Sequence, residues 1–179
     1  MKKVLLVAVA FVGFTAVHAQ KIYATKSAQV KFFSSTKAED IEATNSQAES
    51  KLSDKGPLMF SLLIKGFRFE NELMQEHFNE KDYMNSDQYP KSEFKGTITN
   101  VATVNFTKDG AYPVVAEGNL TIRGVTQKVT AKGTLTVAGG KVSTKSVFKI
   151  KAKDFGLTGK LITGTISEEL EITVTAKYD

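Results

Sequence analysis

Few residues of the chain could do chemistry, and histidine is the scarcest of them. The chain of 179 residues has two histidines, His18 and His77, and no cysteine. Without cysteine, neither a Cys–His catalytic pair nor a zinc cluster of familiar spacing can be assembled. A serine nucleophile would need His77 as its base, yet no serine lies in a Gly-x-Ser-x-Gly segment and no glycine-rich phosphate loop is found. The sequence therefore predicts no catalytic residue, no metal and no cofactor.

Two pairs of carboxylates remain as candidates for acid–base catalysis. Glu168 and Glu169 are adjacent, and adjacent strand residues point to opposite faces, so the two cannot enter one cleft. Glu76 and Glu80 are four residues apart, a spacing that usually belongs to the solvated face of an amphipathic helix. A hydrolase consequently ranks last among the functions that the residues suggest.

The start of the chain predicts export. Two lysines follow the initiating methionine, an apolar run extends from Val4 to Val17, and the small residue Ala19 precedes the expected cleavage point. This is the order of a cleavable signal peptide, and the run is shorter than the about 20 apolar residues of a membrane-spanning helix. We expect residues 1–19 to be the signal, and residues 20–179 to form one domain in the periplasm or outside the cell, without a membrane-spanning segment.

Charge and composition restrict the classes of partner that we expect for this mature domain. Once the two lysines of the signal are gone, 22 basic and 19 acidic side chains remain, a net charge of +3. The two kinds are interleaved, without the Lys/Arg block that is typical of a nucleic-acid or membrane patch, so we expect no nucleic-acid partner. Because no disulfide can form, stability must come from packing.

Strands dominate the predicted secondary structure. Apolar residues alternate with polar ones from Gln29 onward, which is typical of strands with one buried face, and a polar stretch from Ser34 to Ser53 interrupts the pattern. The alternating sets are Val30 and Phe32; Phe60, Leu62 and Ile64; Phe94, Gly96 and Ile98; Ala102, Val104 and Phe106; Leu120 and Ile122; Val129 to Val137; Phe148, Ile150 and Ala152; and Leu170 to Ala176.

Glycines mark the expected turns between these strands. The pattern changes register at Gly66, which suggests a bulge, and Asp109-Gly110 is a strong hairpin-turn pair. Tight turns are also expected at Arg123-Gly124 and Gly139-Gly140. Seven to nine strands joined by short turns predict an all-β antiparallel barrel or sandwich, and a barrel of about eight strands has room for side chains or one small ligand.

One short helix is expected over residues 71–84. Asn71 can cap it, and Leu73, Met74, His77 and Phe78 recur at helical spacing. On this face His77 has two interpretations: it could hydrogen-bond the headgroup of a ligand at a barrel mouth, or tie the helix to a neighbouring strand. We favour the structural role, and the ligand role stays open.

Three sequence blocks resemble the YceI-like family. They are Leu73-Met74-Gln75-Glu76-His77-Phe78-Asn79-Glu80 with the later Tyr89-Pro90 and Phe94-Lys95-Gly96; Gly118-Asn119-Leu120-Thr121-Ile122-Arg123-Gly124-Val125-Thr126; and Asp154-Phe155-Gly156. Their order and spacing agree with the family over nearly the whole mature chain, although Ala152 stands where relatives often have arginine. The resemblance implies a lipocalin-like antiparallel barrel in the periplasm whose interior holds a long apolar molecule, such as a polyisoprenoid or a fatty-acid derivative.

This resemblance, together with the alternating apolar faces, selects the candidate binding residues. The expected ligand-lining residues are Phe60, Leu62, Ile64, Phe78, Phe94, Ile98, Leu120, Ile122, Phe148, Ile150 and Phe155. The expected contacts to a polar headgroup are His77, Lys95 and Arg123. The rival hypothesis is a structural or interaction protein of the cell envelope with a packed interior, and a homodimer is left open.

Overall fold

The computed structural model describes residues 20–37, 39–158 and 166–179. Eight strands form one antiparallel sheet in the order β1-β9-β8-β7-β6-β5-β3-β2, and a two-residue strand, β4, pairs with β2. The bounds are β1 Ile22–Ser35, β2 Asp40–Ser53, β3 Pro57–Leu63, β4 Arg68–Phe69, β5 Lys91–Ile98, β6 Gly110–Ile122, β7 Val125–Ala138, β8 Lys141–Lys151 and β9 Glu169–Tyr178, with the helix α1 at Glu72–Asn79.

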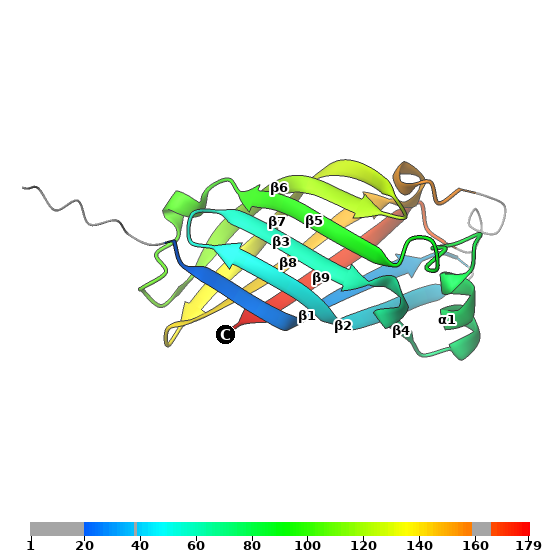
Figure 1. The fold of residues 1–179 in the computed structure, drawn as a ribbon, viewed down its shortest axis with the longest axis horizontal. Helices are drawn as coiled ribbons and strands as arrows, with labels where there is room; N and C mark the ends of the chain where they lie inside the picture. Colours follow the sequence, from blue (N-terminus) through cyan, green and yellow to red (C-terminus); the bar gives the residue numbers. More distant parts are fainter. Residues whose placement is uncertain (1–19, 38, 159–165) are drawn as a thin grey trace, which may run out of the picture.

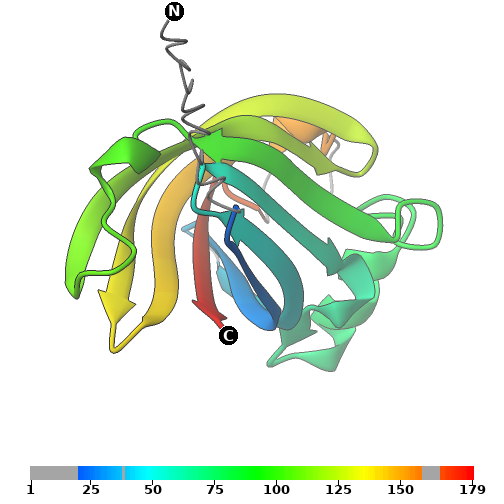
Figure 2. The ribbon, with the colours of Figure 1, turned by 60° about the vertical axis from the view of Figure 1, so that its left-hand side comes forward.

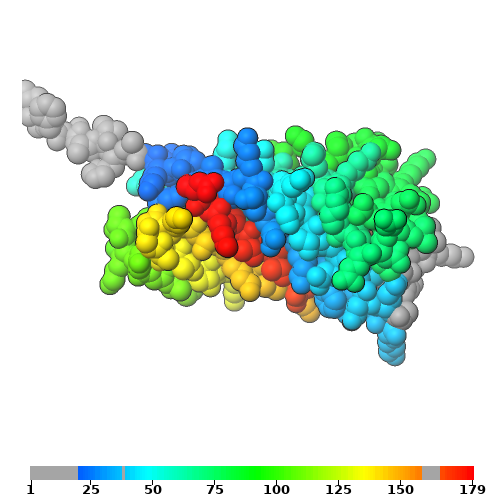
Figure 3. All heavy atoms as spheres, turned by 90° about the horizontal axis from the view of Figure 1, so that it is seen from below, coloured from blue at the N-terminus to red at the C-terminus, as the bar shows by residue number. Residues whose placement is uncertain are grey.

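The sheet closes on itself through β1. This strand pairs with β2 over most of its length and with β9 over Gln29 to Phe33. Figures 1 and 2 show the resulting elongated barrel, with α1 at one end and the C-terminus at the other. In the space-filling view, β9 in red lies between β1 in blue and β8 in orange (Figure 3). The expected all-β antiparallel barrel of about eight strands with one short helix is confirmed.

The polar stretch before residue 53 is a strand that the pattern concealed. β2 spans Asp40–Ser53, and its buried positions alternate on either side of an irregularity at Ser46-Gln47, where the register against β1 shifts. Several of these inward positions hold small or polar residues, including Ala43, Asn45 and Ser50, rather than large apolar ones. Asn45 is satisfied within the wall, because its side-chain Nδ2 donates to the carbonyl of Leu63 at 2.9 Å. A hydrophobic periodicity cannot detect a strand whose inner face is built this way.

Two expected local features were wrong. At Gly66 the chain makes a 3-10 turn, Ile64–Gly66, instead of a bulge. The segment containing Val104 and Phe106 is also not a strand, because Val101–Thr103 forms a 3-10 turn and Gly110 is already the first residue of β6. The apolar side chains of Val104 and Phe106 instead fold over the end of the barrel and pack into its core.

The hairpin turn expected at Asp109-Gly110 is also wrong, because Gly110 begins β6 and the turn lies earlier, at Phe106-Thr107. The helix and the turns at Arg123-Gly124 and Gly139-Gly140 agree with expectation. Asn71 caps α1 by accepting from the backbone N–H groups of Leu73 and Met74, although the helix ends at Asn79, earlier than expected. The turns at Arg123-Gly124 and Gly139-Gly140 both have two successive residues with positive φ. This is the conformation of the two-residue hairpin turns that fit twisted strands, and glycine adopts it without steric cost.

The end of the barrel opposite α1 is solidly packed. Its core includes Leu52, Leu135 and Val137, all with almost no exposed surface. Tyr178 lies in the same core, and its hydroxyl and the Ser50 hydroxyl form a buried hydrogen bond of 2.9 Å. Burial raises the pKa of Tyr178 above its usual value, although the hydrogen bond to Ser50 acts in the opposite direction.

Candidate functional site

A large apolar cavity occupies the barrel between the packed end and α1. Its volume is about 440 Å³, within the usual range of roughly 300–1,000 Å³ for small-molecule sites. Side chains from β1, β2, β3, β5, β6, β7, β8, β9 and α1 contribute to its wall, and most of them are apolar. The cavity therefore offers an elongated surface suited to an apolar molecule.

Solvent exposure of the inward side chains shows where the interior is hollow. Phe60, Phe94 and Phe148 point inward and line the cavity, yet each is only half-buried. By contrast Leu135, further along the inner face of β7, has no exposed surface at all. Side chains at the packed end are therefore in van der Waals contact on all sides, whereas those around the cavity face empty space on one side.

Small residues on the inner faces of β5, β6 and β7 create this space. Gly96 and Gly118 are directly paired across β5 and β6. A Cβ atom added to Gly118 would lie 2.5 Å from the Cα of Gly96, so neither position accepts a side chain without moving a strand. Ala116 and Ala131, a cross-strand pair of β6 and β7, also have small side chains on this inner face, and the ring of Phe94 lies over Gly96. The close approach of the β5 and β6 backbones thus excludes a side chain at this pair.

Four phenylalanine rings close the α1 side of the cavity. Phe78 of α1 stacks on Phe32 of β1 with ring centroids 5.6 Å apart, and it contacts Phe69 at 5.0 Å. Phe67 meets both Phe32 and Phe78 edge-on. Each such aromatic pair adds about 0.5–1.5 kcal/mol beyond simple area burial. The cluster holds a helix that has no fully buried residue of its own against the barrel.

All eleven residues expected to contact a ligand line the cavity. Phe60, Leu62, Ile64, Phe78, Phe94, Ile98, Leu120, Ile122, Phe148, Ile150 and Phe155 belong to its wall. This confirms where they lie, and contact with a ligand stays a prediction. Sequence reasoning missed further lining residues, among them Phe32, Phe67, Phe69, Ile172 and Val174. The alternation of Val30 with Phe32 and of Ile172 with Val174 was a signal that could have identified three of them.

The three expected headgroup residues lie in different places. His77 lines the cavity near its α1 end, where its ring stacks on Tyr83 at 6.4 Å, and no hydrogen bond ties its imidazole to a strand within the described residues. Lys95 is on the outer face of β5, where its ammonium group contacts the Glu93 carboxylate at 2.8 Å. This hydrogen bond and the charge of Lys95 lower the pKa of Glu93.

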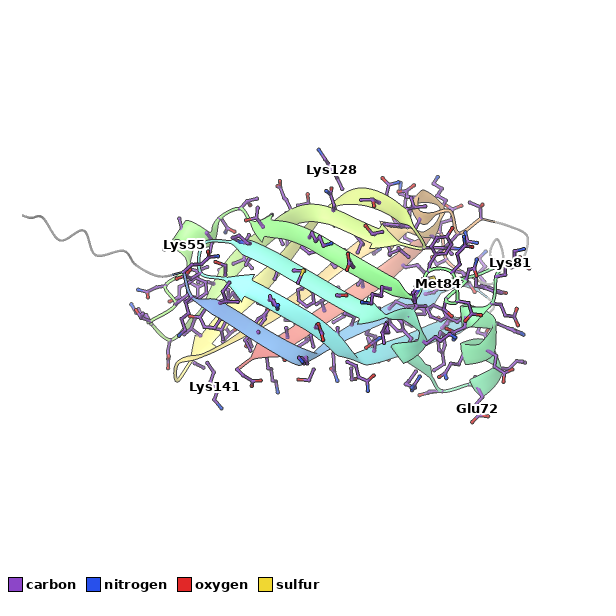
Figure 4. All side chains as sticks on the ribbon, viewed as in Figure 1. Lys55, Glu72, Lys81, Met84, Lys128 and Lys141 are labelled. Atoms are coloured by element: carbon purple, nitrogen blue, oxygen red, sulfur yellow. The ribbon has the colours of Figure 1, made fainter. Side chains whose placement is uncertain are left out.

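Arg123 is engaged with the backbone. Its Nη1 donates to the carbonyl of Gly156 at 3.2 Å, and its Nη2 donates to the carbonyl of Lys81 at 3.0 Å. The guanidinium thereby connects the β6–β7 turn to two other loops at the α1 end of the barrel. Lys81 and Met84 mark this end in Figure 4. Arg123 is not among the residues that line the cavity.

Groups for other chemistry are sparse in the described part of the chain. Within residues 20–37, 39–158 and 166–179, no three histidine, aspartate or glutamate side chains gather as they would around a metal ion. Over the same ranges, the helices are all too short or too polar to cross a membrane.

Comparisons with solved structures agree with the fold. A polyisoprenoid-binding domain from Saccharophagus degradans superposes with a TM-score of 0.76 at 12% identity, covering 88% of this chain and 97% of that domain. BcnA of Burkholderia cenocepacia superposes with a TM-score of 0.67 at 21% identity, covering 83% of this chain and 94% of BcnA. At these identities the likeness establishes a shared fold.

Sequence comparisons establish the family. A UPF0312 protein of Yersinia enterocolitica is 32% identical over 108 residues, which are 57% of this chain and 51% of that protein. The match thus spans about half the length of this curated relative. The family model of the YceI-like domain matches residues 7–178. The chain belongs to the YceI-like domain family.

Proposed function

We propose that the protein binds a long apolar molecule, a polyisoprenoid or a fatty-acid derivative, inside its barrel and does so without catalysis. The observation that carries this proposal is the hollow apolar interior of about 440 Å³, bounded at one end by a packed core. The polyisoprenoid-binding domain of Saccharophagus degradans, which has the same fold, supports the choice of ligand class.

Desolvation would supply the binding free energy. Each buried CH₂ group contributes about 0.8 kcal/mol, so an isoprene unit that enters the cavity adds several times that amount before ordering costs are subtracted. The polar groups at the cavity wall are few beside the apolar ones; among them, Asn71 and His77 lie at the α1 end, and Lys145 and Ser146 lie on β8. Chain length should therefore determine affinity more strongly than any single polar contact.

A titration with prenols of increasing length tests this proposal. Geraniol, farnesol and geranylgeraniol differ by one isoprene unit, and affinity should rise by at least about tenfold per unit until the cavity is filled. Calorimetry and displacement of a fluorescent fatty acid both report binding, and the chain has no tryptophan to interfere with the probe. Equal affinity for the three prenols, or binding of none, would contradict the proposal.

We further propose that this binding takes place outside the cytoplasm, after removal of residues 1–19. Support comes from the basic start, the apolar run and the small residues that precede Gln20. N-terminal sequencing of protein recovered from separate cell fractions tests it. A mature protein that begins at Gln20 and is found in the periplasm or the medium is expected, and an uncleaved protein in the cytoplasm would refute it.

A further inference from the structure

The wall of the barrel splits between β7 and β8. These strands pair only from Gly133 opposite Ser146 to Ala138 opposite Lys141, although β7 begins at Val125 and β8 continues to Lys151. Figure 2 shows the two strands, in yellow and orange, joined at their hairpin. Beyond Gly133, each strand remains paired with its other neighbour, β6 or β9. Residues 128–132 and 147–151 thus face each other outside the ladder, and we call the space between them the β7–β8 slot.

Side-chain hydrogen bonds bound the slot at both ends. The Ser146 hydroxyl donates to the carbonyl of Lys132 at 2.7 Å where the ladder stops. At the far end, Gln127 Nε2 donates to the carbonyl of Asp154 at 2.8 Å. Five strand residues lie between these ends, a length of about 15 Å. Peptide groups at strand edges outside a ladder need water or side chains as partners, which favours a hydrated slot.

The slot is next to the cavity. Val129, Ala131 and Phe148 form its inner side and line the cavity. The cavity also reaches Thr134 and Lys145, the cross-strand pair beside the end of the ladder, although these two residues point outward along their strands. The edge of the cavity therefore reaches the wall beside the end of the ladder.

The outer rim of the slot is basic. From Gly118 to Lys153 the chain has eight basic residues and no acidic one, and strand alternation turns the lysines of β7 and β8 outward. The rim lysines are Lys128, Lys132, Lys145, Lys149 and Lys151. Lys128 projects away from the barrel in Figure 4. Sequence reading found no basic block because alternation spaces these lysines two to four residues apart along each strand.

Lys132 and Lys145 are the rim lysines nearest the end of the ladder. Their cross-strand neighbours on the outer face are uncharged: Val115 for Lys132, and Thr134 and Thr175 for Lys145. Neither forms an ion pair within the described residues. Lys149 does contact Glu169, at 3.4 Å, but both side chains are at least half exposed and such a pair contributes only about 0–1 kcal/mol.

The α1 end of the cavity has charges of both signs. Glu39 lines the cavity there, and α1 carries Glu72 and Glu76 with His77 as its only basic residue. Glu72 points away from the barrel at this end in Figure 4. Lys81 and the Arg123 guanidinium also lie at this end, where Arg123 is bonded to two backbone carbonyls. By contrast, β7 and β8, which flank the slot, contain lysines and no carboxylate.

We propose that the β7–β8 slot is an opening of the cavity and the site that receives the anionic headgroup of a bound amphiphile, held by Lys132 and Lys145. The inference rests on the proposed function, because the apolar tail must occupy the cavity. Phosphate and carboxylate headgroups share the required chemistry. Charge-assisted hydrogen bonds to exposed lysines would add affinity that weakens with salt.

The test compares ligands that share a tail and differ in the head. Farnesyl phosphate, farnesol, a fatty acid and inorganic phosphate are titrated into the wild type, into Lys132→Glu/Lys145→Glu, and into the control Lys26→Glu/Lys51→Glu on β1 and β2. The slot variant should bind farnesyl phosphate at least about tenfold more weakly while its affinity for farnesol is unchanged, and the control should match the wild type. The fatty acid shows whether carboxylates are accepted as well.

A single thiol at the rim locates the headgroup independently. Val147 is 46% exposed on the outer face of β8, and the chain has no native cysteine. Farnesyl phosphate should slow alkylation of Val147→Cys several-fold and leave the control Leu63→Cys, at a site 55% exposed, unaffected. Equal protection of both thiols, unchanged binding by the slot variant, or inorganic phosphate binding as tightly as farnesyl phosphate would overturn the inference. Failure of farnesol to bind the wild type would instead refute the proposed function.

Discussion

Replacing Ala116 with phenylalanine distinguishes a hollow barrel from a packed one by the sign of the stability change. The methyl group of Ala116 faces the cavity from β6, between Ile98 of β5 and Ala131 of β7. A phenyl ring placed there would fill existing space. Full burial of a phenylalanine is worth about 1.5–3 kcal/mol, and partial exposure to the remaining cavity reduces this to about 1–2 kcal/mol of added stability.

The same substitution at Ala176 is the matched control. Ala176 also points inward from a strand, but it lies in the packed end and is only 1% exposed. Overpacking such a site typically costs about 1–3 kcal/mol. Urea unfolding followed by circular dichroism measures both changes in unfolding free energy. In thermal unfolding, each kcal/mol should shift Tm by about 2–4 °C in a domain of this size.

Ligand binding gives the second readout of the Ala116→Phe variant. The added ring occupies volume that a prenol would need, so affinity for geranylgeraniol should fall at least about tenfold, while Ala176→Phe should leave it unchanged at temperatures where that variant is folded. If Ala116→Phe destabilised the protein as much as Ala176→Phe and did not affect binding, the interior would be packed and the reasoning refuted.

Three further changes test individual contacts. Phe78→Ala removes the ring that joins α1 to β1 and β4, so the unfolding free energy should fall by about 2–4 kcal/mol and amide exchange in α1 should accelerate. The control Leu73→Ala, at a site 58% exposed, should cost no more than about 0.5 kcal/mol. Asn71→Ala removes the helix cap and should cost about 1 kcal/mol in urea unfolding; an unchanged midpoint would contradict the cap. Burial raises the pKa of Tyr178, so on raising the pH the unfolded chain loses the phenol proton before the folded protein does. The contribution of Tyr178 to the unfolding free energy is therefore fully present below pH 10.0 and is lost as the pH rises through the folded-state pKa. Tyr178→Phe should flatten this decline.

The alternation of apolar residues predicted an antiparallel barrel or sandwich, and together with the family resemblance it identified eleven of the residues that line the cavity. It identified inner faces such as that of Phe148 and Ile150 because period two is a direct consequence of strand geometry. It failed on β2, where small and polar residues occupy the inner face, and on Val104 and Phe106, whose alternation arises in a turn that folds over the barrel end. Composition alone does not distinguish these cases, because tertiary packing decides which alternating residues belong to strands.

The hollow interior and the β7–β8 slot could not be predicted in this way. Small residues of the cavity wall, such as Ala116 of β6 and Ala131 of β7, become neighbours only through strand pairing, and this adjacency is a property of the folded sheet. The slot likewise depends on where pairing between β7 and β8 stops, although both strands have regular alternation along their whole length. The basic rim was present in the sequence, but its lysines come together only when the strands are placed side by side.

Closure of the barrel through β1 also constrains when the protein can fold. The wall is complete only after β9, near the end of the chain, pairs with β1 near its start, and the hydrogen bond between Ser50 and Tyr178 joins residues 128 positions apart. Such long-range pairing makes folding slow, since loop-closure entropy must be overcome before the contacts form. On a chain emerging from a ribosome, the barrel cannot close until β9 has arrived. Until then the wall around the cavity is incomplete, and its interior is accessible from the side.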